Sequence, residues 1–402
     1  MSPEAFVFDP FATGFAADPY PHYAQLRATA PTHEHPLGFW VVSKYQDVAG
    51  LQRSSQSVDE QHLTRLPAWK SDSSRLGKEN RMMRGLSILD RDPPDHTRLR
   101  RLVAKAFTPR ALDALQPSVE KLVGAALDRI AEAGTADIVA ELAFPVPFAI
   151  ISEMLGVPVV EHTRLRELTA VLVLALEPLA DPDLQARIRA ANQELFAMVG
   201  ELIRWKRGAP GDDLLTRLIT AEIEGDVLSE DELIAQVMLL YIAGHETTVN
   251  HLAGGILALL RHPDQARRLR EEPELADNAV AEILRYDTPV QLMRRITVES
   301  LSIGDAEIPD GNLVIACVAA ANRDPDFWGA DADELRLDRA NAAQHLSFGA
   351  GIHHCLGAAL VRLEARVAFT HFVERFPDAV IEELRWNGRI NVRGPATLSI
   401  SV

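Results

Sequence analysis

The chain has 402 residues, 47% of them hydrophobic and 24% charged, which is ordinary for a globular protein with a large core. Its 41 lysines and arginines are outnumbered by 57 aspartates and glutamates, and the net charge of −16 argues against nucleic acid or an anionic membrane surface as a partner. With only two cysteines a disulfide framework is excluded, so a cytoplasmic location is expected. No apolar stretch approaches the roughly 20 residues of a membrane span.

The first part of the chain predicts short elements followed by an irregular segment. Residues 18–30 predict a helix with Asp18 as its N-cap. Residues 39–42 predict a strand, and Ser43 after it could cap the next short helix. Residues 54–89 are mostly polar and lack a clear period, and a loop of that length inside a compact domain is usually functional.

Residues 92–107 predict an arginine-rich helix that two prolines open. His96 and Arg100 are four residues apart and therefore share one face, which by itself describes a solvated basic surface. Helical periodicity recurs over residues 111–130, 138–155 and 186–205. The first half of the chain is thus predicted to be mainly helical.

A long helix is predicted over residues 230–260, with Ser229 as its N-cap. Small and apolar side chains recur at helical spacing along one face of its middle. These residues are Leu240, Ala243, Gly244 and Thr247. We expect this face to leave room for a bound group.

The same helix contains the beginning of a zinc-protease motif. His245 and Glu246 match the first half of His-Glu-x-x-His, but the second histidine would have to stand at position 249, which is Val249. His251 comes two residues later and lies off that face. The sequence therefore excludes this kind of zinc site, and a purely structural helix remains the simple alternative.

The last third of the chain predicts a helix followed by strands. Glu282 and Arg285 are an i, i+3 pair, a spacing typical of weak surface salt bridges. Residues 301–318 predict short strands with a turn at 309–311. Residues 390–402 predict strands around residues 394–395, with the tip of the hairpin near Ala396.

Residues 348–364, FGAGIHHCLGAALVRLE, place Cys355 where a glycine-rich loop becomes the first turn of a helix. The N–H groups and dipole at a helix start stabilise a thiolate, the form that binds metals. A buried free cysteine is the simple alternative. A zinc site of His353, His354 and Cys355 is another, but no second ligand pair of the usual spacing is evident.

The whole string resembles the haem-binding loop of the cytochrome P450 family. Its fixed places are filled by Phe348, Gly349, Gly351, His353, Cys355 and Gly357. The resemblance implies that Cys355 is the axial thiolate ligand of the iron of haem b. It also implies that Phe348 packs beside the sulfur, that His353 contacts a haem propionate, and that Gly349 and Gly357 lie against the cofactor.

Two earlier stretches are similar to further motifs of that family. The helix at 92–107 resembles the one in which a histidine and an arginine hold the propionates, here His96 and Arg100. The string AGHETT resembles the oxygen-activating motif, which implies that Ala243 and Gly244 lie against haem. Thr247 would then support the bound oxygen, and Glu246, where the family often has aspartate, would link that hydroxyl to water.

A third motif is similar to the family's Glu-x-x-Arg pair and its partner arginine. It implies a buried structural network of Glu282, Arg285 and Arg339 that braces the ligand loop. The strand that follows implies a further propionate ligand at Arg295, with Arg294 as the alternative if the register slips by one.

The resemblance covers nearly the whole chain, with the motifs in the family's order. It implies a mainly α fold with a small β-rich part, the cytochrome P450 fold, in one domain over residues 1–402. It implies a monooxygenase that inserts one oxygen atom of O2 into a hydrophobic organic substrate, such as a secondary metabolite. Apolar pocket residues are expected at Leu240, Val290, Met293 and Ala396.

Electrons are expected from a ferredoxin-type partner, because no flavin or iron–sulfur segment is present. Its docking surface is expected at the basic residues Arg101, Lys105, Arg362 and Arg366. The protein is expected to be a monomer. Two alternatives stay open: oxidation driven by peroxide or otherwise independent of Thr247, and a haem-binding protein that does not catalyse.

Overall fold

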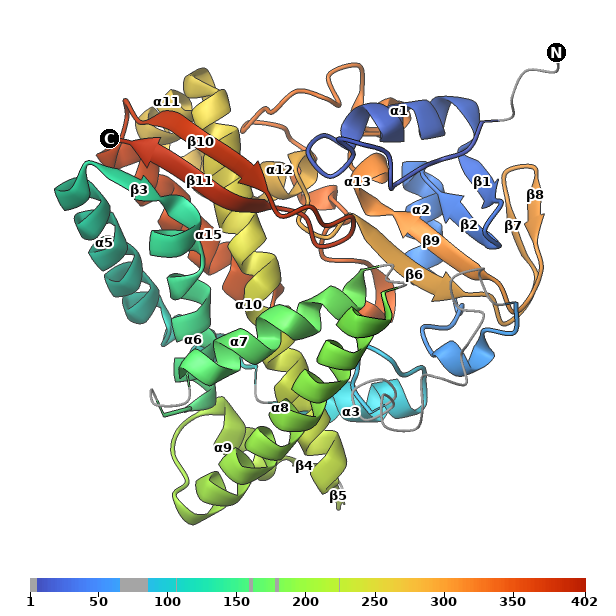
Figure 1. Ribbon diagram of the computed structural model, residues 1–402, viewed down its shortest axis with the longest axis horizontal. Coiled ribbons are helices and arrows are strands. Elements are labelled where there is room, and N and C mark those ends of the chain that lie inside the picture. The colour runs from blue at the N-terminus through green and yellow to red at the C-terminus, as the bar shows by residue number, and fades with distance from the viewer. Residues whose placement is uncertain (1–5, 66–85, 106, 159–161, 178–180, 224) are drawn as a thin grey trace.

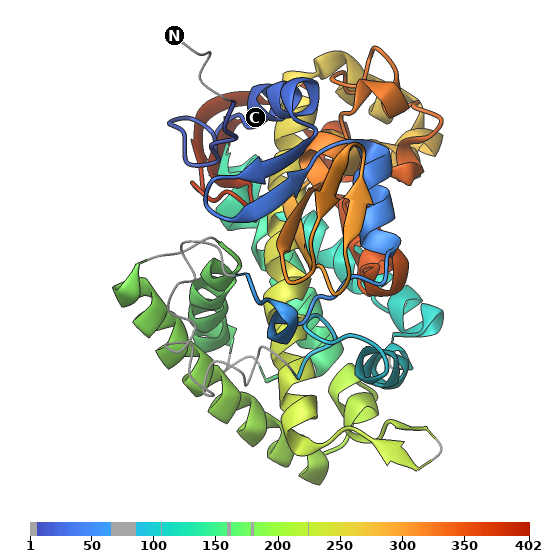
Figure 2. The same cartoon turned by 90° about the vertical axis from the view of Figure 1, so that its right-hand side faces the viewer.

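The structure is a computed structural model that describes residues 6–65, 86–105, 107–158, 162–177, 181–223 and 225–402. A helical body surrounds the long helix α10 (Glu230–Arg261), which crosses the middle of the molecule, and a smaller β-rich part lies beside it (Figure 1). Figure 2 shows the same helix running past the sheet of blue and orange strands.

The other α-helices follow in chain order. They are α1 (Tyr20–Thr29), α2 (Tyr45–Arg53), α3 (Asp95–Ala104), α4 (Pro109–Asp113), α5 (Gln116–Ala133), α6 (Pro145–Leu155), α7 (His162–Leu172), α8 (Pro182–Gly208), α9 (Leu214–Ile219), α11 (Pro263–Glu271), α12 (Ala276–Tyr286), α13 (Val318–Ala321), α14 (Pro325–Trp328) and α15 (Ala358–Arg375). Short 3-10 turns and one π-helical turn complete them: η1 (Glu60–His62), η5 (Val139–Ala143, π), η7 (Val173–Leu176), η8 (Pro273–Leu275), η9 (Ala342–Gln344) and η10 (Gly351–His353).

The strands form one mixed sheet and one antiparallel sheet, with two small hairpins. The mixed sheet has the order β1 (Thr32–His35), β2 (Phe39–Val42), β9 (Leu313–Cys317), β6 (Leu292–Ile296), and only β2 and β9 run parallel in it. The second has the order β10 (Val380–Trp386), β11 (Pro395–Ser401), β3 (Thr135–Asp137). The hairpins pair β4 (Glu222–Ile223) with β5 (Asp226–Val227) and β7 (Leu301–Ile303) with β8 (Ala306–Ile308).

Helix α10 is stable where it stands because of its cap and its apolar surface. The Ser229 hydroxyl accepts the Glu232 N–H while the Glu232 carboxylate accepts the Ser229 N–H, which forms a complete capping box. Most of its later residues are buried, as expected for a helix that is apolar on several faces. It packs against α6, α8 and α15.

The hydrophobic core has two large parts that meet along α10. One lies among α5, α10, α12 and α15 and includes Ile256 and Phe369; the other lies among α6, α7, α8 and α10 and includes Tyr241. The apolar faces of the mixed sheet bury two smaller clusters against α1 and α2. The site described below therefore rests on a central helix fixed from several sides.

Several predicted elements are confirmed. The strand at 39–42 is β2, the long helix begins one residue after Ser229, and β7, β8 and β9 fall within the predicted 301–318 region with residues 309–311 between β8 and β9. The predicted helix at 186–205 lies inside α8, whose cap is Asp181. Residues 66–85 of the irregular segment lie outside the described residues.

The predicted cap of α1 is present: Pro19 has helical backbone angles, and the Asp18 carboxylate accepts the Tyr20 N–H at 3.4 Å. Two other predicted helix features were wrong in detail. Ser43 donates its hydroxyl to the Pro31 carbonyl instead of capping α2. The helices expected at 111–130 and 138–155 are each divided: α4 is separate from α5, which starts beside a proline, and η5 precedes α6, which starts at Pro145.

Candidate functional site

The loop around Cys355 is a tight turn that glycine makes possible. The Cys355 N–H donates to the Phe348 carbonyl at 2.8 Å, and Gly349 and Gly351 have φ of 71° and 72°. A Cβ on Gly351 would lie 2.9 Å from the Gln52 carbonyl oxygen, so that position also needs glycine for space. The loop ends where Gly357 caps α15.

The predicted acidification of the Cys355 thiol was wrong for this structure. Although Cys355 is only half-buried by its exposed surface, desolvation raises the pKa of the thiol above its ordinary value. The Gly357 and Ala358 N–H groups and the guanidinium groups of Arg100 and Arg362 lower that pKa, but by less. A bound metal cation would deprotonate a thiol that coordinates it at this place.

Phe348 covers one side of this loop. It is 9% exposed, and the Arg362 guanidinium carbon lies 4.8 Å from its ring centroid. A guanidinium over an aromatic face is attracted by the ring. The packing predicted for Phe348 is therefore accompanied by a cation, which the sequence motif does not specify.

Four nitrogen-rich side chains gather here from three segments: His96 and Arg100 on α3, Arg295 on β6, and His353 in the loop itself. The His96 and His353 ring centroids are 4.2 Å apart, and Arg100 donates to the His354 carbonyl at 2.6 Å. Arg295 is 6% exposed and donates to the Gln52 carbonyl at 3.2 Å. The structure thus brings together the four predicted propionate ligands.

One carboxylate, Asp92, acts on this cluster and raises the pKa values of His96, Arg295 and His353, but burial lowers all three by more. His96 is 1% exposed, and neither ring nitrogen has a hydrogen-bond partner among the described residues. Burial, then His96 and Arg295, lower the pKa of His353 to about 3, and burial and Arg100 lower that of His96. Burial lowers the pKa of Arg295 to about 10. Buried polar nitrogens without hydrogen-bond partners are rare in proteins. A ligand that carries carboxylates would supply the missing acceptors.

The neighbouring arginine on β6 points the other way. Arg294 is paired with Glu60, and it donates to Asp90 at 3.3 Å. Successive side chains of a strand alternate between faces, so Arg294 and Arg295 lie on opposite sides of the sheet. The geometry favours Arg295 over the alternative register.

On α10 the predicted face stays open although the helix around it is buried. Ala243 is exposed, Leu240, Gly244 and Thr247 are half-buried, and residues on the opposite faces are buried. The Thr247 hydroxyl donates to the Ala243 carbonyl at 2.9 Å, one turn earlier. This open strip is where a flat group could lie against the helix.

Glu246 has a partner that the sequence did not reveal. Its carboxylate is paired with the Arg389 guanidinium, and the two side chains are 12% and 16% exposed. The second carboxylate oxygen is 3.7 Å from His245 Nε2, and burial lowers the pKa of that histidine. Arg389 is 143 positions away along the chain, so no local pattern could have indicated the contact.

The predicted apolar pocket residues come from three elements. Leu240 is on α10, Val290 bridges to Val392, and Met293 on β6 lies near Gly349, whose Cβ would be 3.7 Å from the Met293 sulfur. Ala396 is exposed on β11, and the turn of the hairpin is at residues 387–394. The predicted tip near Ala396 was therefore wrong, and the pocket role of Ala396 stays a prediction.

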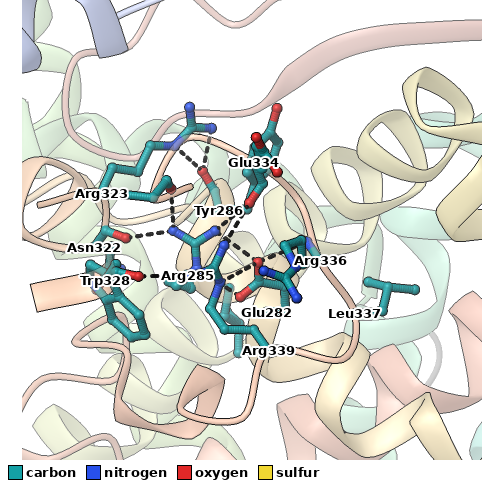
Figure 3. A network of polar contacts seen from close by, with 12 residues as sticks. Glu282, Arg285, Tyr286, Asn322, Arg323, Trp328, Glu334, Arg336, Leu337 and Arg339 are labelled. Carbon is teal, nitrogen blue, oxygen red and sulfur yellow. Dashed lines mark hydrogen bonds and ion pairs between the residues drawn. The ribbon is translucent and has the colours of Figure 1, made fainter. Parts of the chain in front are cut away.

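Glu282, Arg285 and Arg339 form a buried network, shown in Figure 3. Arg285 and Glu282 are both 0% exposed, and two guanidinium nitrogens donate to the carboxylate at 2.7 and 2.8 Å. Arg339 Nε donates to the same carboxylate at 3.1 Å. The spacing alone suggested a weak surface salt bridge, but the pair is fully buried.

The network reaches the ligand loop through Asn322. Arg285 donates to the Asn322 carbonyl at 2.9 Å, while the Asn322 side chain binds the Leu346 N–H and the Ser347 hydroxyl, each at 2.8 Å. The Ser347 hydroxyl donates in turn to the Leu284 carbonyl. Residues 321–325, ANRDP, are typical of the family, but the sequence assigned no contact to Asn322 and did not single out Ser347.

The zinc alternative finds no geometry to support it. Among the residues the structure describes, no three His, Cys, Asp or Glu side chains are placed to hold a metal ion together. The residues present fit haem better: a single thiol at a helix start, glycines around it, and the unpartnered imidazole of His96 with two nearby guanidinium groups for two carboxylates. A Cβ on Gly357 would meet nothing within 4 Å, which leaves room for a bulky planar group.

Residues 53–383 match the sequence family described as Cytochrome P450. The chain belongs to the cytochrome P450 family. It is 39% identical to Cytochrome P450 107B1 of Saccharopolyspora erythraea over 99% of this chain and 98% of that relative. It is 38% identical to the monooxygenase PikC of Streptomyces venezuelae, over 99% of this chain and 94% of the relative.

Solved structures agree with the fold. The P450BioI structure in complex with an acyl carrier protein matches at a TM-score of 0.88, with 31% identity, over 97% of this chain and 100% of that one. CYP164A2 of Mycobacterium smegmatis matches at 0.87 with 38% identity, over 98% of both chains. The predicted family and the mainly α fold with a smaller β part are confirmed.

Because it belongs to this family, the protein is an oxidoreductase of the monooxygenase class, and the family implies a haem cofactor. Several relatives are bacterial, and PksS of Bacillus subtilis is named for polyketide biosynthesis. Within the described ranges, none of the helices has the length and apolarity that crossing a bilayer requires.

Proposed function

We propose that this P450 inserts one oxygen atom of O2 into a hydrophobic organic substrate, with haem b held by Cys355. The carrying observation is the place of Cys355, half-buried at the start of α15 beside His96, whose buried ring nitrogens have no partner among the described residues. His96, Arg100, Arg295 and His353 would hold the propionates. Haem bound there supplies the redox chemistry of dioxygen, and thiolate ligation favours O–O cleavage.

Thr247 and Glu246 would deliver protons. The Thr247 hydroxyl donates its hydrogen to the Ala243 carbonyl, so its oxygen remains free to accept a hydrogen bond from a group on the open side of the helix. The Glu246 carboxylate is 12% exposed, which allows it to take a proton from water. Positioned donors and acceptors of this kind typically accelerate a reaction by about 10²–10⁴-fold.

The substrate would have an apolar body. Leu240, Val290, Met293 and Ala396 are apolar, and hydrophobic contacts would supply most of the binding free energy. The similar structure of CYP109E1 from Bacillus megaterium is in complex with testosterone. That of a myxobacterial P450, 35% identical to this chain, is in complex with myristic acid. A secondary metabolite of comparable apolarity fits the relatives from polyketide biosynthesis.

A ferredoxin-type protein would donate the electrons at the Cys355 side. Arg101 is exposed there, Arg366 is 40% exposed, and Arg362 stacks on Phe348 next to the thiol. Lys105 donates to the Glu222 carbonyl at 2.7 Å and is less available. Opposite charges steer such encounters. A monomer of one domain in the cytoplasm completes the proposal.

The first test is the absorption spectrum of the reduced holoprotein with carbon monoxide. A strongly red-shifted Soret band is expected, and Cys355→His should abolish it while Cys317→Ala, at the other cysteine, keeps it. An unshifted band in the wild-type protein would overturn the assignment of Cys355.

A second test separates the proposal from peroxide-driven oxidation. Thr247→Ala should leave NADPH consumption with a surrogate ferredoxin and reductase largely intact while hydrogen peroxide replaces most of the product. Product formed equally well by the variant would favour the peroxide-driven alternative. Absence of NADPH consumption by the wild-type protein with every substrate tried would favour a non-catalytic haem protein.

A further inference from the structure

The loop at residues 387–394, between β10 and β11, is held by a carboxylate from a distant helix. Glu177, which follows η7, accepts three consecutive backbone N–H groups, from Ile390 at 2.8 Å, Asn391 at 3.0 Å and Val392 at 2.9 Å. Asn391 also donates its amide to the Leu176 carbonyl at 3.3 Å. Three charge-assisted bonds to one side chain fix the loop to the end of η7.

The residue just before these three amides pairs with Glu246 on α10. Arg389 and Glu246 are both mostly buried, so their attraction is screened less than that of a surface pair. His245 cannot replace Arg389 as the cationic partner, because burial lowers the pKa of His245 and keeps it neutral near pH 7. Arg166, whose charge also disfavours protonated His245, stacks on Phe144.

The loop also touches the strand that begins the predicted pocket. The Gln291 N–H donates to the Asn391 carbonyl at 2.9 Å, and Val290 and Val392 form a β-bridge. The same loop therefore meets both the residues just before β6 and, through Glu177, the end of η7. A substrate that contacts Val290 reaches the same short loop that holds Glu246.

We propose that Arg389 is a positioning residue for Glu246, and that Glu177 sets its position by clamping the loop to the end of η7. This rests on the proposed proton-delivery role of Glu246. Adjacent Cα atoms are about 3.8 Å apart, so Arg389 cannot keep its place if the amides of 390–392 leave Glu177. The loop therefore couples the segment after α7 to the acid on α10.

Hydrogen exchange of the holoprotein tests the clamp without turnover. The amides of residues 390–392 should exchange roughly tenfold faster in Glu177→Gln, the effect of losing a charge-assisted acceptor, and also faster in Arg389→Gln. Glu167→Gln and Arg385→Gln are the controls, because those side chains are 57% and 66% exposed and lie on α7 and β10, the elements just before η7 and the loop. Unchanged exchange in Arg389→Gln would overturn the coupling.

Turnover tests the effect on Glu246, with myristic acid as the probe and a surrogate ferredoxin and reductase. Hydroxylated product per NADPH should fall roughly tenfold in Arg389→Gln and severalfold in Glu177→Gln, with Arg389→Lys partly restoring it. The double variant should be no worse than Arg389→Gln, since both changes act through one contact. The proposal would be overturned if the losses of the two single variants multiplied in the double variant. It would also be overturned if Glu177→Gln formed as much product per NADPH as the wild-type protein.

The two arms distinguish this inference from the proposed function. A wild-type protein that makes no product from any substrate tried, myristic acid included, while its exchange data show the coupled loop would reject the monooxygenase proposal alone. Normal product formation, with amide exchange at 390–392 that does not change in Arg389→Gln, would reject the positioning role of Arg389 and Glu177 alone.

Discussion

Glu282→Gln should destabilise the protein strongly although it changes one oxygen to an amide. The carboxylate accepts four hydrogen bonds, from Arg285 Nε at 2.7 Å, Arg285 Nη2 at 2.8 Å, the Arg336 N–H at 3.0 Å and Arg339 Nε at 3.1 Å. Three of them meet the same oxygen, Oε1. Glutamine can keep that oxygen, but its amide then faces the Arg285 Nε–H, a second donor.

The magnitude follows from these four contacts. Three bonds that lose the acceptor's charge weaken by about 1 kcal/mol each, and a buried donor left facing a donor costs about 1–3 kcal/mol more. The sum of about 4–6 kcal/mol overlaps the roughly 3–5 kcal/mol found when one partner of a buried pair is removed. Since whole domains are stable by about 5–15 kcal/mol, the variant should be close to unfolding.

Urea unfolding of the holoprotein, followed by far-UV circular dichroism and the Soret band, measures this loss. Arg336→Gln is the matched control: its side chain is 47% exposed and pairs with Asp331, so its loss should stay below about 1 kcal/mol. Its backbone N–H to Glu282 remains. Equal losses in the two variants would refute the reasoning that the network is energetically buried.

Three further predictions concern other parts of the molecule. Gly255→Ala should destabilise by about 1–3 kcal/mol because its Cβ would lie 2.2 Å from the Phe369 ring, whereas Gly254→Ala, with 3.7 Å to Asp287, should be neutral or stabilising in thermal melts. Burial lowers the pKa of His251 from its ordinary 6.5 to about 3. Between these values the histidine is protonated in the unfolded chain and neutral in the folded one, so the free energy of unfolding falls as the pH falls. His251→Phe should remove about 1.4 kcal/mol per pH unit from that acid slope, measured by urea unfolding between about pH 6.5 and 4.5, and an unchanged slope would contradict it. Arg362→Glu should slow reduction by a ferredoxin roughly tenfold at low salt, with the difference fading as salt is added; equal stopped-flow rates would reject this docking surface.

Local signals predicted those features that neighbouring residues determine. Ser229 was predicted as the N-cap of the long helix from its place before a helical pattern, and residues 39–42 pair as a strand because β-branched and aromatic residues favour one. The glycines around Cys355 likewise predict a turn, because the positive φ angles of Gly349 and Gly351 are adopted easily only by glycine.

Contacts between distant segments could not be predicted in this way. Glu246 meets Arg389 and Glu177 meets the amides of 390–392 only because the hairpin turn folds over α10. The pKa of the Cys355 thiol depends on how much protein surrounds the sulfur, which the helix-start position does not reveal. The family motif indicated a brace of Glu282, Arg285 and Arg339, but not its route through Asn322.

The buried arginines of this brace bind mostly to main-chain oxygen atoms. Arg285 donates to the carbonyls of Asn322, Ala332 and Glu334, and Arg339 donates to those of Trp328, Asp331 and Glu334. A carbonyl is present whatever the side chain. The exposed positions of residues 331–339 are therefore open to mutational drift, so related chains can diverge in this segment while the ligand loop keeps its shape, and a library built there would retain folded members.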